Sequence, residues 1–109
     1  MTNTEIKSTK VIYKYELPFK DDTCIVQIPE NSIIRKVAMR KGDLAGPSVL
    51  WTNGDKYPLV WIECDKDAPL HSVEFLIYQT GYPIENDLVY LDTVFEDPFV
   101  WHIYKRKDI

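Results

Sequence analysis

The sequence has few of the residues that form covalent or metal cross-links, with two cysteines and two histidines among 109 residues. Cys24 and Cys64 lie in apolar, strand-like segments where a small thiol packs easily, so both are expected to be reduced thiols. Together with His71 and His102, they do not have the spacing of a zinc finger. The sequence therefore predicts a domain that folds without a disulfide framework or a structural metal.

Long apolar runs and an excess of positive charge are also absent. No run approaches the ~18 apolar residues of a membrane span, and the opening "MTNTEIKSTK" lacks the apolar core of a secretory signal. The formal net charge is −4, which disfavours a surface built to neutralise nucleic-acid phosphates. We expect a cytoplasmic protein with neither a membrane nor a nucleic-acid partner.

The sequence contains no complete catalytic or cofactor motif. Its four glycines, at positions 42, 46, 54 and 81, form neither a P-loop nor a dinucleotide fingerprint. The acidic residues Glu63, Asp65 and Asp67 lack the glycine and terminal glutamate of an EF-hand loop, so a solvated turn is the simpler interpretation. No local signature pairs a cysteine with a histidine for nucleophilic catalysis. We therefore predict a protein that is not an enzyme and binds no cofactor or metal.

β-Strand patterns dominate what is present. Hydrophobic residues make up 45% of the chain, and many alternate with polar residues at the period of a half-buried strand. The segments predicted as strands are 11–17, 23–29, 33–42, 57–65, 71–80, 90–96 and 99–106. This pattern predicts one all-β domain over residues 1–109, mainly antiparallel and folded as a sandwich or barrel-like sheet, with residues 1–9 as a flexible N-terminus.

Smaller features complete the expected fold. Residues 48–51 form a possible short strand, Asn53-Gly54 suits a hairpin turn, and residues 84–90 are expected to form at most one helical turn. Alternating or continuous apolar positions predict which side chains are buried. The residues expected in the core are Tyr13, Tyr15, Val26, Val37, Trp61, Phe75, Ile77 and Trp101.

Two short clusters of cations could hold a flat anionic ligand beside aromatic rings. Arg35, Lys36, Arg40 and Lys41 share one predicted strand, and Lys105 to Lys107 end the last one. Arginine pairs with phosphate and stacks on rings, while tyrosine and tryptophan offer stacking faces for a base. The alternative is that these charges are solvated and protect the edges of the sheet.

The last third of the chain resembles a family of small, largely uncharacterised proteins encoded by tailed bacteriophages and prophages. The resemblance rests on "VEFLIYQTGYPIENDLVYLDTV" at 73–94 and "FVWHIYK" at 99–105. Their characteristic motifs are a Y-x-T-G-x-P-I turn and a closing F-V-W-H strand. The departures from the family pattern are Gln79, Tyr82 and Asp92. The matching residues are Ile77, Tyr78, Thr80, Gly81, Pro83, Ile84, Tyr90, Leu91, Thr93, Val94, Phe99, Val100, Trp101 and His102.

This resemblance implies a function by stoichiometric binding in the host cytoplasm. The first hypothesis is a non-enzymatic phage protein that counters host antiviral defence by sequestering a nucleotide-derived immune signal. The alternative is a protein–protein interaction module that masks a host protein, or a structural or accessory component of the phage. Aromatic residues make up 13% of this short chain, and aromatic side chains are enriched at subunit contacts, so we also expect a homo-oligomer.

The most informative candidate site is the turn around Gly81. Gly81 tolerates a positive φ, Thr80 adds a hydroxyl, and Tyr78 and Tyr82 flank them with stacking faces. A phosphate bound there needs a cation, for which the candidates are Arg35, Arg40 and Arg106, from a neighbouring strand or subunit. Strand alternation places His102 on the face opposite Trp101, towards a neighbouring strand or subunit. The alternatives are a plain glycine turn and a hydrogen-bonded structural histidine.

Overall fold

The computed structural model describes residues 8–39, 57–96 and 98–107, and these residues form seven β-strands and no helix. The strands are β1 (Lys10–Glu16), β2 (Thr23–Pro29), β3 (Ile33–Met39), β4 (Pro58–Asp65), β5 (Leu70–Gln79), β6 (Leu88–Glu96) and β7 (Phe99–Arg106). The expected all-β fold is thus confirmed. The possible strand at 48–51 and the Asn53-Gly54 turn lie outside the described residues. Residues 84–90, where at most one helical turn was expected, form none: residues 83–87 are irregular and β6 begins at Leu88.

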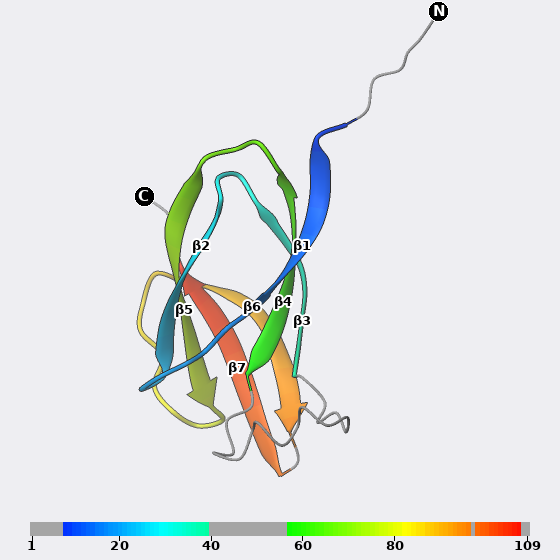
Figure 1. Cartoon of the computed structure of the whole chain (residues 1–109). Coiled ribbons are helices and arrows are strands. Elements are labelled where there is room, and N and C mark those ends of the chain that lie inside the picture. The colour runs from blue at the N-terminus through cyan, green and yellow to red at the C-terminus, as the bar shows by residue number, and fades with distance from the viewer. Residues whose placement is uncertain (1–7, 40–56, 97, 108–109) are drawn as a thin grey trace, which may run out of the picture.

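Two antiparallel sheets pack face to face as a sandwich (Figure 1). Sheet A has three strands in the order β1-β4-β3, and sheet B has four in the order β2-β5-β7-β6. The β2–β3 and β4–β5 turns both lead from one sheet to the other at the same end of the molecule (Figure 1). No helix in the described part of the chain is long and apolar enough to cross a membrane.

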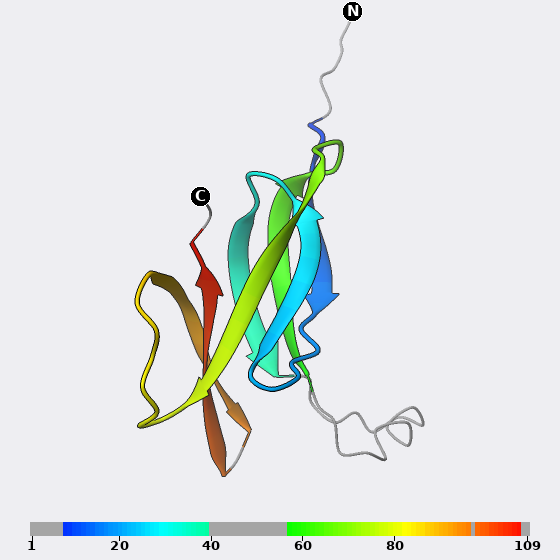
Figure 2. The ribbon, with the colours of Figure 1, turned by 90° about the vertical axis from the view of Figure 1, so that its left-hand side faces the viewer.

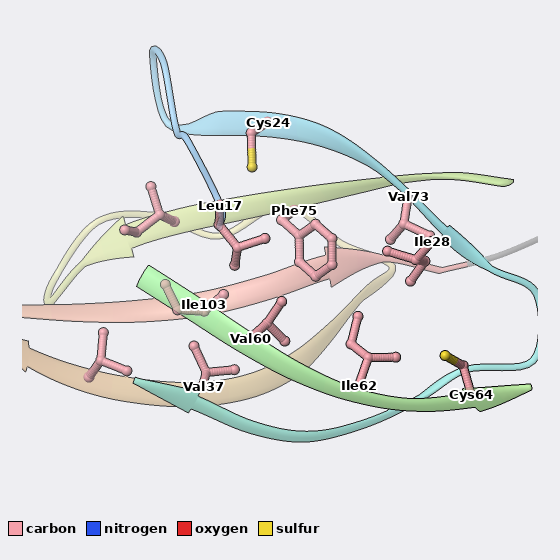
Figure 3. Packing of buried hydrophobic residues seen from close by; sticks show 12 residues of the cluster. Leu17, Cys24, Ile28, Val37, Val60, Ile62, Cys64, Val73, Phe75 and Ile103 are labelled. Atoms are coloured by element: carbon pink, nitrogen blue, oxygen red, sulfur yellow. The ribbon is translucent and has the colours of Figure 1, made fainter. Parts of the chain in front are cut away.

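The hydrophobic core fills the space between the two sheets (Figure 3). Strand alternation on β4 directs Val60, Ile62 and Cys64 inward, where they meet Phe75 of β5 and Ile103 of β7. Phe75, Val60, Ile62 and Ile103 are all fully buried. Burial of large apolar side chains stabilises the fold by roughly 1.5–3 kcal/mol each.

The predicted core is correct in part. Among the expected residues, Val37, Phe75 and Ile77 are buried, while Tyr15, Val26 and Trp101 are partly buried against the core. The prediction for Tyr13 is wrong, because its side chain is 41% exposed on the edge strand β1. Trp61 is partly buried, but it alternates with Val60 and Ile62 and therefore lies on the outer face of sheet A.

Turns with left-handed backbone conformations connect the strands. Asp21 and Asp22 before β2, and Asn31 between β2 and β3, have φ values of 56°, 73° and 62°. Asp and Asn tolerate this region because their short side chains bond to nearby backbone groups. Between β4 and β5, the Asp65 carboxylate accepts the amide of Asp67 at 2.9 Å, which lowers the pKa of Asp65. The acidic segment is a turn built around this side chain.

Candidate functional site

A cluster of tyrosines around His102 covers the outer face of sheet B. Alternation along β7 buries Ile103 inward and turns His102 and Tyr104 outward. The strand register then places Tyr78 of β5 beside His102, and Tyr90 of β6 beside Tyr104. We call the group the tyrosine–histidine cluster; its members are Tyr78, Thr80, Tyr90, Thr93, His102 and Tyr104.

A β-bulge in β6 allows two members of the cluster to share a face. Tyr90 and Thr93 are three residues apart, so a regular strand would direct them to opposite faces. The register of β6 against β7 shifts between Tyr90 and Asp92, which adds Leu91 as an extra residue. Thr93 therefore pairs with His102 on the outer face, and the Tyr90 hydroxyl bonds to the Thr93 hydroxyl.

His102 is held by hydroxyl groups at both ring nitrogens. Its Nε2 lies 2.8 Å from Thr80 Oγ1, and its Nδ1 lies 2.9 Å from Thr93 Oγ1. A hydroxyl donates or accepts, so this arrangement accommodates either tautomer of the ring. In a catalytic triad a carboxylate commonly orients the histidine, whereas here Thr93 occupies that position. The geometry fixes the imidazole and supports the interpretation of His102 as a hydrogen-bonded histidine.

The tyrosine rings form a continuous aromatic surface. Tyr104 lies between Tyr78 and Tyr90, with ring centroids 5.6 Å and 5.4 Å away and interplanar angles of 85° and 69°. These edge-to-face contacts contribute roughly 0.5–1.5 kcal/mol each beyond the burial of area. Tyr90 is still 52% exposed, so the surface is ordered and accessible at once.

The segment 80–87 passes over the outer face of sheet B. It joins β5 to β6, which run in the same direction on either side of β7, and it lies on the side of sheet B away from sheet A (Figure 2). Arg106 connects the segment to the sheet, because its guanidinium bonds to Glu74 at 2.8 Å and to Glu85 at 3.1 Å. The hydrogen bond from Arg106, followed by that from Thr23, lowers the pKa of Glu74.

Residues 8–109 match the model of a protein family that is described as a domain of unknown function, DUF7352. The chain belongs to the DUF7352 family. Neither curated proteins nor solved structures give a match to it. The family description names no activity or ligand, so functional inference for this DUF7352 domain rests on its own residues.

Four of the residues predicted for a site lie on one face of this DUF7352 domain. Tyr78, Thr80, His102 and Arg106 all belong to the outer face of sheet B or its rim. Gly81 follows directly and has a φ of 94°, a conformation that favours glycine. Tyr82 lies in the same turn and its amide donates to the Gln79 carbonyl at 3.2 Å.

The other predicted cations do not join this site within one chain. Arg35 sits at a β-bulge of β3, on the outer face of the opposite sheet, and pairs with Glu63 at 2.8 Å. Arg40 lies outside the described residues. Arg35 therefore does not meet the Gly81 turn within one chain, and its contribution from a neighbouring subunit stays a prediction. Arg106 is already paired with two carboxylates.

A pocket of about 280 Å³ does lie beside the Gly81 turn. It is lined by Asp22, Ile77, Tyr78, Gln79, Tyr82, Pro83 and Trp101. Two tyrosines and a tryptophan offer stacking faces, whereas the lining that the structure describes includes the Asp22 carboxyl group and no lysine or arginine. The described lining suits an aromatic group better than a phosphate.

The cysteines belong to the core rather than to a site. Both are free and buried, and Cys24 lies beneath β2 near Phe75 (Figure 3). Burial, followed by the nearby Glu74 carboxylate, raises the pKa of the Cys24 thiol to about 12. Burial also raises the pKa of Cys64. Because the thiolate is the reactive form, neither cysteine is suited to nucleophilic chemistry in the folded protein.

Sequence reasoning missed three members of the cluster. Tyr104 could have been found, because it alternates with His102 along the same strand. Tyr90 and Thr93 could not, because only the bulge at Leu91 gives them a common face. Phe95 was also missed. It pairs with Val100 on the outer face and is 71% exposed.

Proposed function

We propose that this domain acts by non-covalent binding and docks a protein surface through the outer face of sheet B. The observation that carries the proposal is the set of large apolar side chains that this face leaves exposed beside the ordered cluster. Phe95 at 71%, Ile25 at 66% and Tyr90 at 52% all project from it. Exposed apolar surface rimmed by polar residues is typical of protein-binding sites.

Electrostatics favour a protein over a phosphorylated ligand on this face. The guanidinium of Arg106 is shared between Glu74 and Glu85, so its charge is already compensated. Asp87 adds another carboxylate to the segment that crosses the sheet. This rim carries more negative than positive charge, and it complements a partner with basic residues around an apolar centre.

The sequence resemblance to tailed-phage proteins supports a specific setting for this activity. In that setting the domain is phage-encoded, acts in the host cytoplasm, and counters antiviral defence by masking a host protein without catalysing a reaction. A role as a phage structural or accessory component uses the same surface. Self-association stays a prediction, since the exposed aromatic side chains would serve a second copy as well.

A nucleotide-derived immune signal is the second candidate ligand. The observation that favours it is the pocket of about 280 Å³ between Tyr78, Tyr82 and Trp101, where a base can stack. The described lining lacks a cation, so in this version Arg40 or a second subunit supplies the phosphate contact. Isothermal calorimetry with cyclic nucleotides and cyclic ADP-ribose isomers tests it, and an absence of binding heat removes this candidate.

Site-specific photo-crosslinking tests the docking proposal. A benzophenone amino acid is placed at Phe95 on sheet B and, as a matched control, at Ile33, which is exposed on β3 of sheet A. Cross-linking is performed in infected host cells, and adducts are identified by mass spectrometry. We expect one defined protein adduct from position 95, competed by the unmodified domain, and none from position 33.

Each outcome of the cross-linking experiment leads to a different conclusion about this face. A discrete host or phage protein at position 95 supports docking, and a second copy of this chain supports an interface between subunits instead. Equal labelling at positions 33 and 95 contradicts the assignment of the face. A Tyr90→Ser variant should lose the adduct and stay folded, with a loss of stability of roughly 0.5–1.5 kcal/mol from its contact with Tyr104.

A further inference from the structure

The outer edge of β1 is the least protected sheet edge among the described strands. Four of the seven described strands lie at sheet edges: β1 and β3 in sheet A, and β2 and β6 in sheet B. β3 and β6 each contain a β-bulge, and they pack against each other across the sandwich. Bulges and coverage by another element both hinder the pairing of an edge strand with a further strand.

β2 is blocked at both ends of its outer edge. Asp22 and Glu30, which flank the strand, bond to β5 and to the residue before it, so the odd-numbered residues of β2 direct their backbone groups outward. Among these, Thr23 already exchanges backbone hydrogen bonds with Lys20, and Pro29 has no N–H. A further strand therefore finds few partners along this edge.

β1 contains neither a bulge nor a proline, and its register with β4 is unbroken over all seven residues (Figure 1). Thr9 and Leu17, which flank the strand, bond to residues at or next to the ends of β4, so the odd-numbered residues of β1 bond to β4. The even-numbered Ile12 and Lys14 therefore direct their N–H and C=O groups away from it. No described strand pairs with this edge.

The inner face of β1 is also incompletely covered. Val11, Tyr13 and Tyr15 point towards the sandwich interior, because they pair with the buried, inward residues of β4. Tyr15 packs against the core, whereas Tyr13 is 41% exposed and contacts Tyr15 edge-to-face at 6.3 Å. An inward aromatic ring at an unpaired edge offers apolar area that a further strand of the same sheet would cover.

We propose that the outer edge of β1 pairs with β1 of a second copy, antiparallel and across a two-fold axis at Tyr13. Ile12 of one copy and Lys14 of the other then exchange both backbone hydrogen bonds, which uses the outward groups of both residues. The two Tyr13 residues form the central non-hydrogen-bonded pair, where side chains approach most closely. The three-stranded sheets A of the two copies become one continuous sheet, and the same patch is buried on each copy.

Charge selects this register among those that satisfy the backbone. Because the outward groups belong to even-numbered residues, the alternatives are shifts of two residues. One shift places Lys10 opposite Lys14 and the other places Lys14 opposite itself, and like charges directly opposite are destabilising. The register centred on Tyr13 avoids both pairs and places Lys10 opposite Glu16. Glu16 already interacts within its own chain, so the register depends chiefly on the lysine pairs that it avoids.

This interface is separate from the outer face of sheet B. β1 belongs to sheet A, and Ile33, the control position for cross-linking, lies on β3 at the opposite edge of that sheet. Pairing through β1 leaves the proposed docking face of both copies accessible. The failure of either proposal therefore does not decide the other.

Analytical ultracentrifugation of the whole chain over a series of micromolar concentrations tests self-association. One strand from each copy buries little area, so we expect a dimer with a Kd in the micromolar range. Lys14→Pro removes an outward N–H and spares the bonds to β4, and proline is tolerated at such edge positions. The variant should stay folded by circular dichroism and dimerise about tenfold or more weakly, because each copy loses one hydrogen bond of the interface.

Gln27→Pro is the matched control, since it removes an outward N–H from the edge of β2 and should dimerise as the unmodified protein does.

Cysteine substitutions test the register and also decide the case if Lys14→Pro unfolds. Tyr13→Cys should form an intermolecular disulfide under mild oxidation, because Cα atoms of a non-hydrogen-bonded pair are about 4.5 Å apart, within disulfide range. Ile12→Cys should not, although Ile12 is more exposed at 58%, because it lies two residues out of register with its own copy. The native cysteines are buried and do not interfere.

The proposal is overturned if the unmodified chain stays monomeric throughout the series, or if Lys14→Pro remains folded and dimerises normally. It is also overturned if Ile12→Cys cross-links as readily as Tyr13→Cys.

Discussion

Replacing Phe75 or Phe95 with alanine removes the same atoms from opposite faces of sheet B. Phe75 is fully buried and is the largest such side chain in the core, whereas Phe95 is 71% exposed. A buried Phe→Ala change typically costs 3–5 kcal/mol, since it loses transfer free energy and leaves a cavity, so we expect about 4 kcal/mol for Phe75→Ala. An exposed substitution usually changes stability by less than about 0.5 kcal/mol, which we expect for Phe95→Ala.

Urea unfolding followed by tryptophan fluorescence measures both variants. With an m-value near 2 kcal/mol/M, Phe75→Ala should lower the midpoint by about 2 M, while Phe95→Ala should leave it nearly unchanged. A domain of this size has roughly 5–15 kcal/mol of stability, so Phe75→Leu provides a milder core variant if the alanine variant is partly unfolded. Equal losses for Phe75→Ala and Phe95→Ala would refute the assignment of the two faces.

Other predictions concern pH, thiols and backbone. The pKa of Glu74 is lowered in the fold, chiefly by Arg106, so its contribution is present above the usual glutamate pKa of about 4.3 and is lost as pH falls. Urea midpoints of the unmodified protein should therefore fall between about pH 5 and 3 more steeply than those of Glu74→Gln. Iodoacetamide should leave Cys24 and Cys64 unmodified in the folded protein and alkylate both in urea, as read by mass; rapid native alkylation would contradict their burial. Gly81→Ala should cost about 1 kcal/mol in urea unfolding because φ is 94° and no atom lies within 4 Å of an added Cβ; an unchanged midpoint would argue against this conformation.

The positions of the strands were predictable because apolar and polar residues alternate along them. β2 and β7 match the predicted ranges, and β1, β4, β5 and β6 differ by one or two residues at their ends. The predicted end of the third strand, at 40–42, lies outside the described residues. Faces were harder to assign where both sides of a strand are apolar. In β4, Leu59 and Trp61 alternate with Val60 and Ile62, and periodicity alone does not say which pair faces the core.

The exposure of a side chain on an edge strand depends on whether a strand of the opposite sheet covers it. Tyr13 pairs with Ile62 and shares the face of Tyr15, yet β1 is an edge strand and Tyr13 remains exposed. The sequence carries no local signal for such coverage. Ile25 is exposed for a different reason, because it pairs with Glu74 on the outer face of sheet B.

The candidate site was partly predictable for a related reason. Thr80, Gly81 and Tyr82 are neighbours in sequence, so their proximity needed no knowledge of the fold. The ion pairs that neutralise Arg35 and Arg106 involve Glu63 and Glu74, which are remote in sequence and meet their partners through sheet register. The prediction that these arginines bind a phosphate did not include these carboxylates, because their proximity depends on the fold.

The position of β7 has a consequence for the order in which the molecule assembles. β7 follows all other strands in the chain, but it lies between β5 and β6 in sheet B. Sheet A and the β2–β5 pair can form first, with β5 presenting an open edge. The β6–β7 hairpin then has to dock on that edge while the connection through Gly81 arches over it. The Arg106–Glu74 contact joins β7 to β5 and can form only after this docking, so it marks a late step of folding.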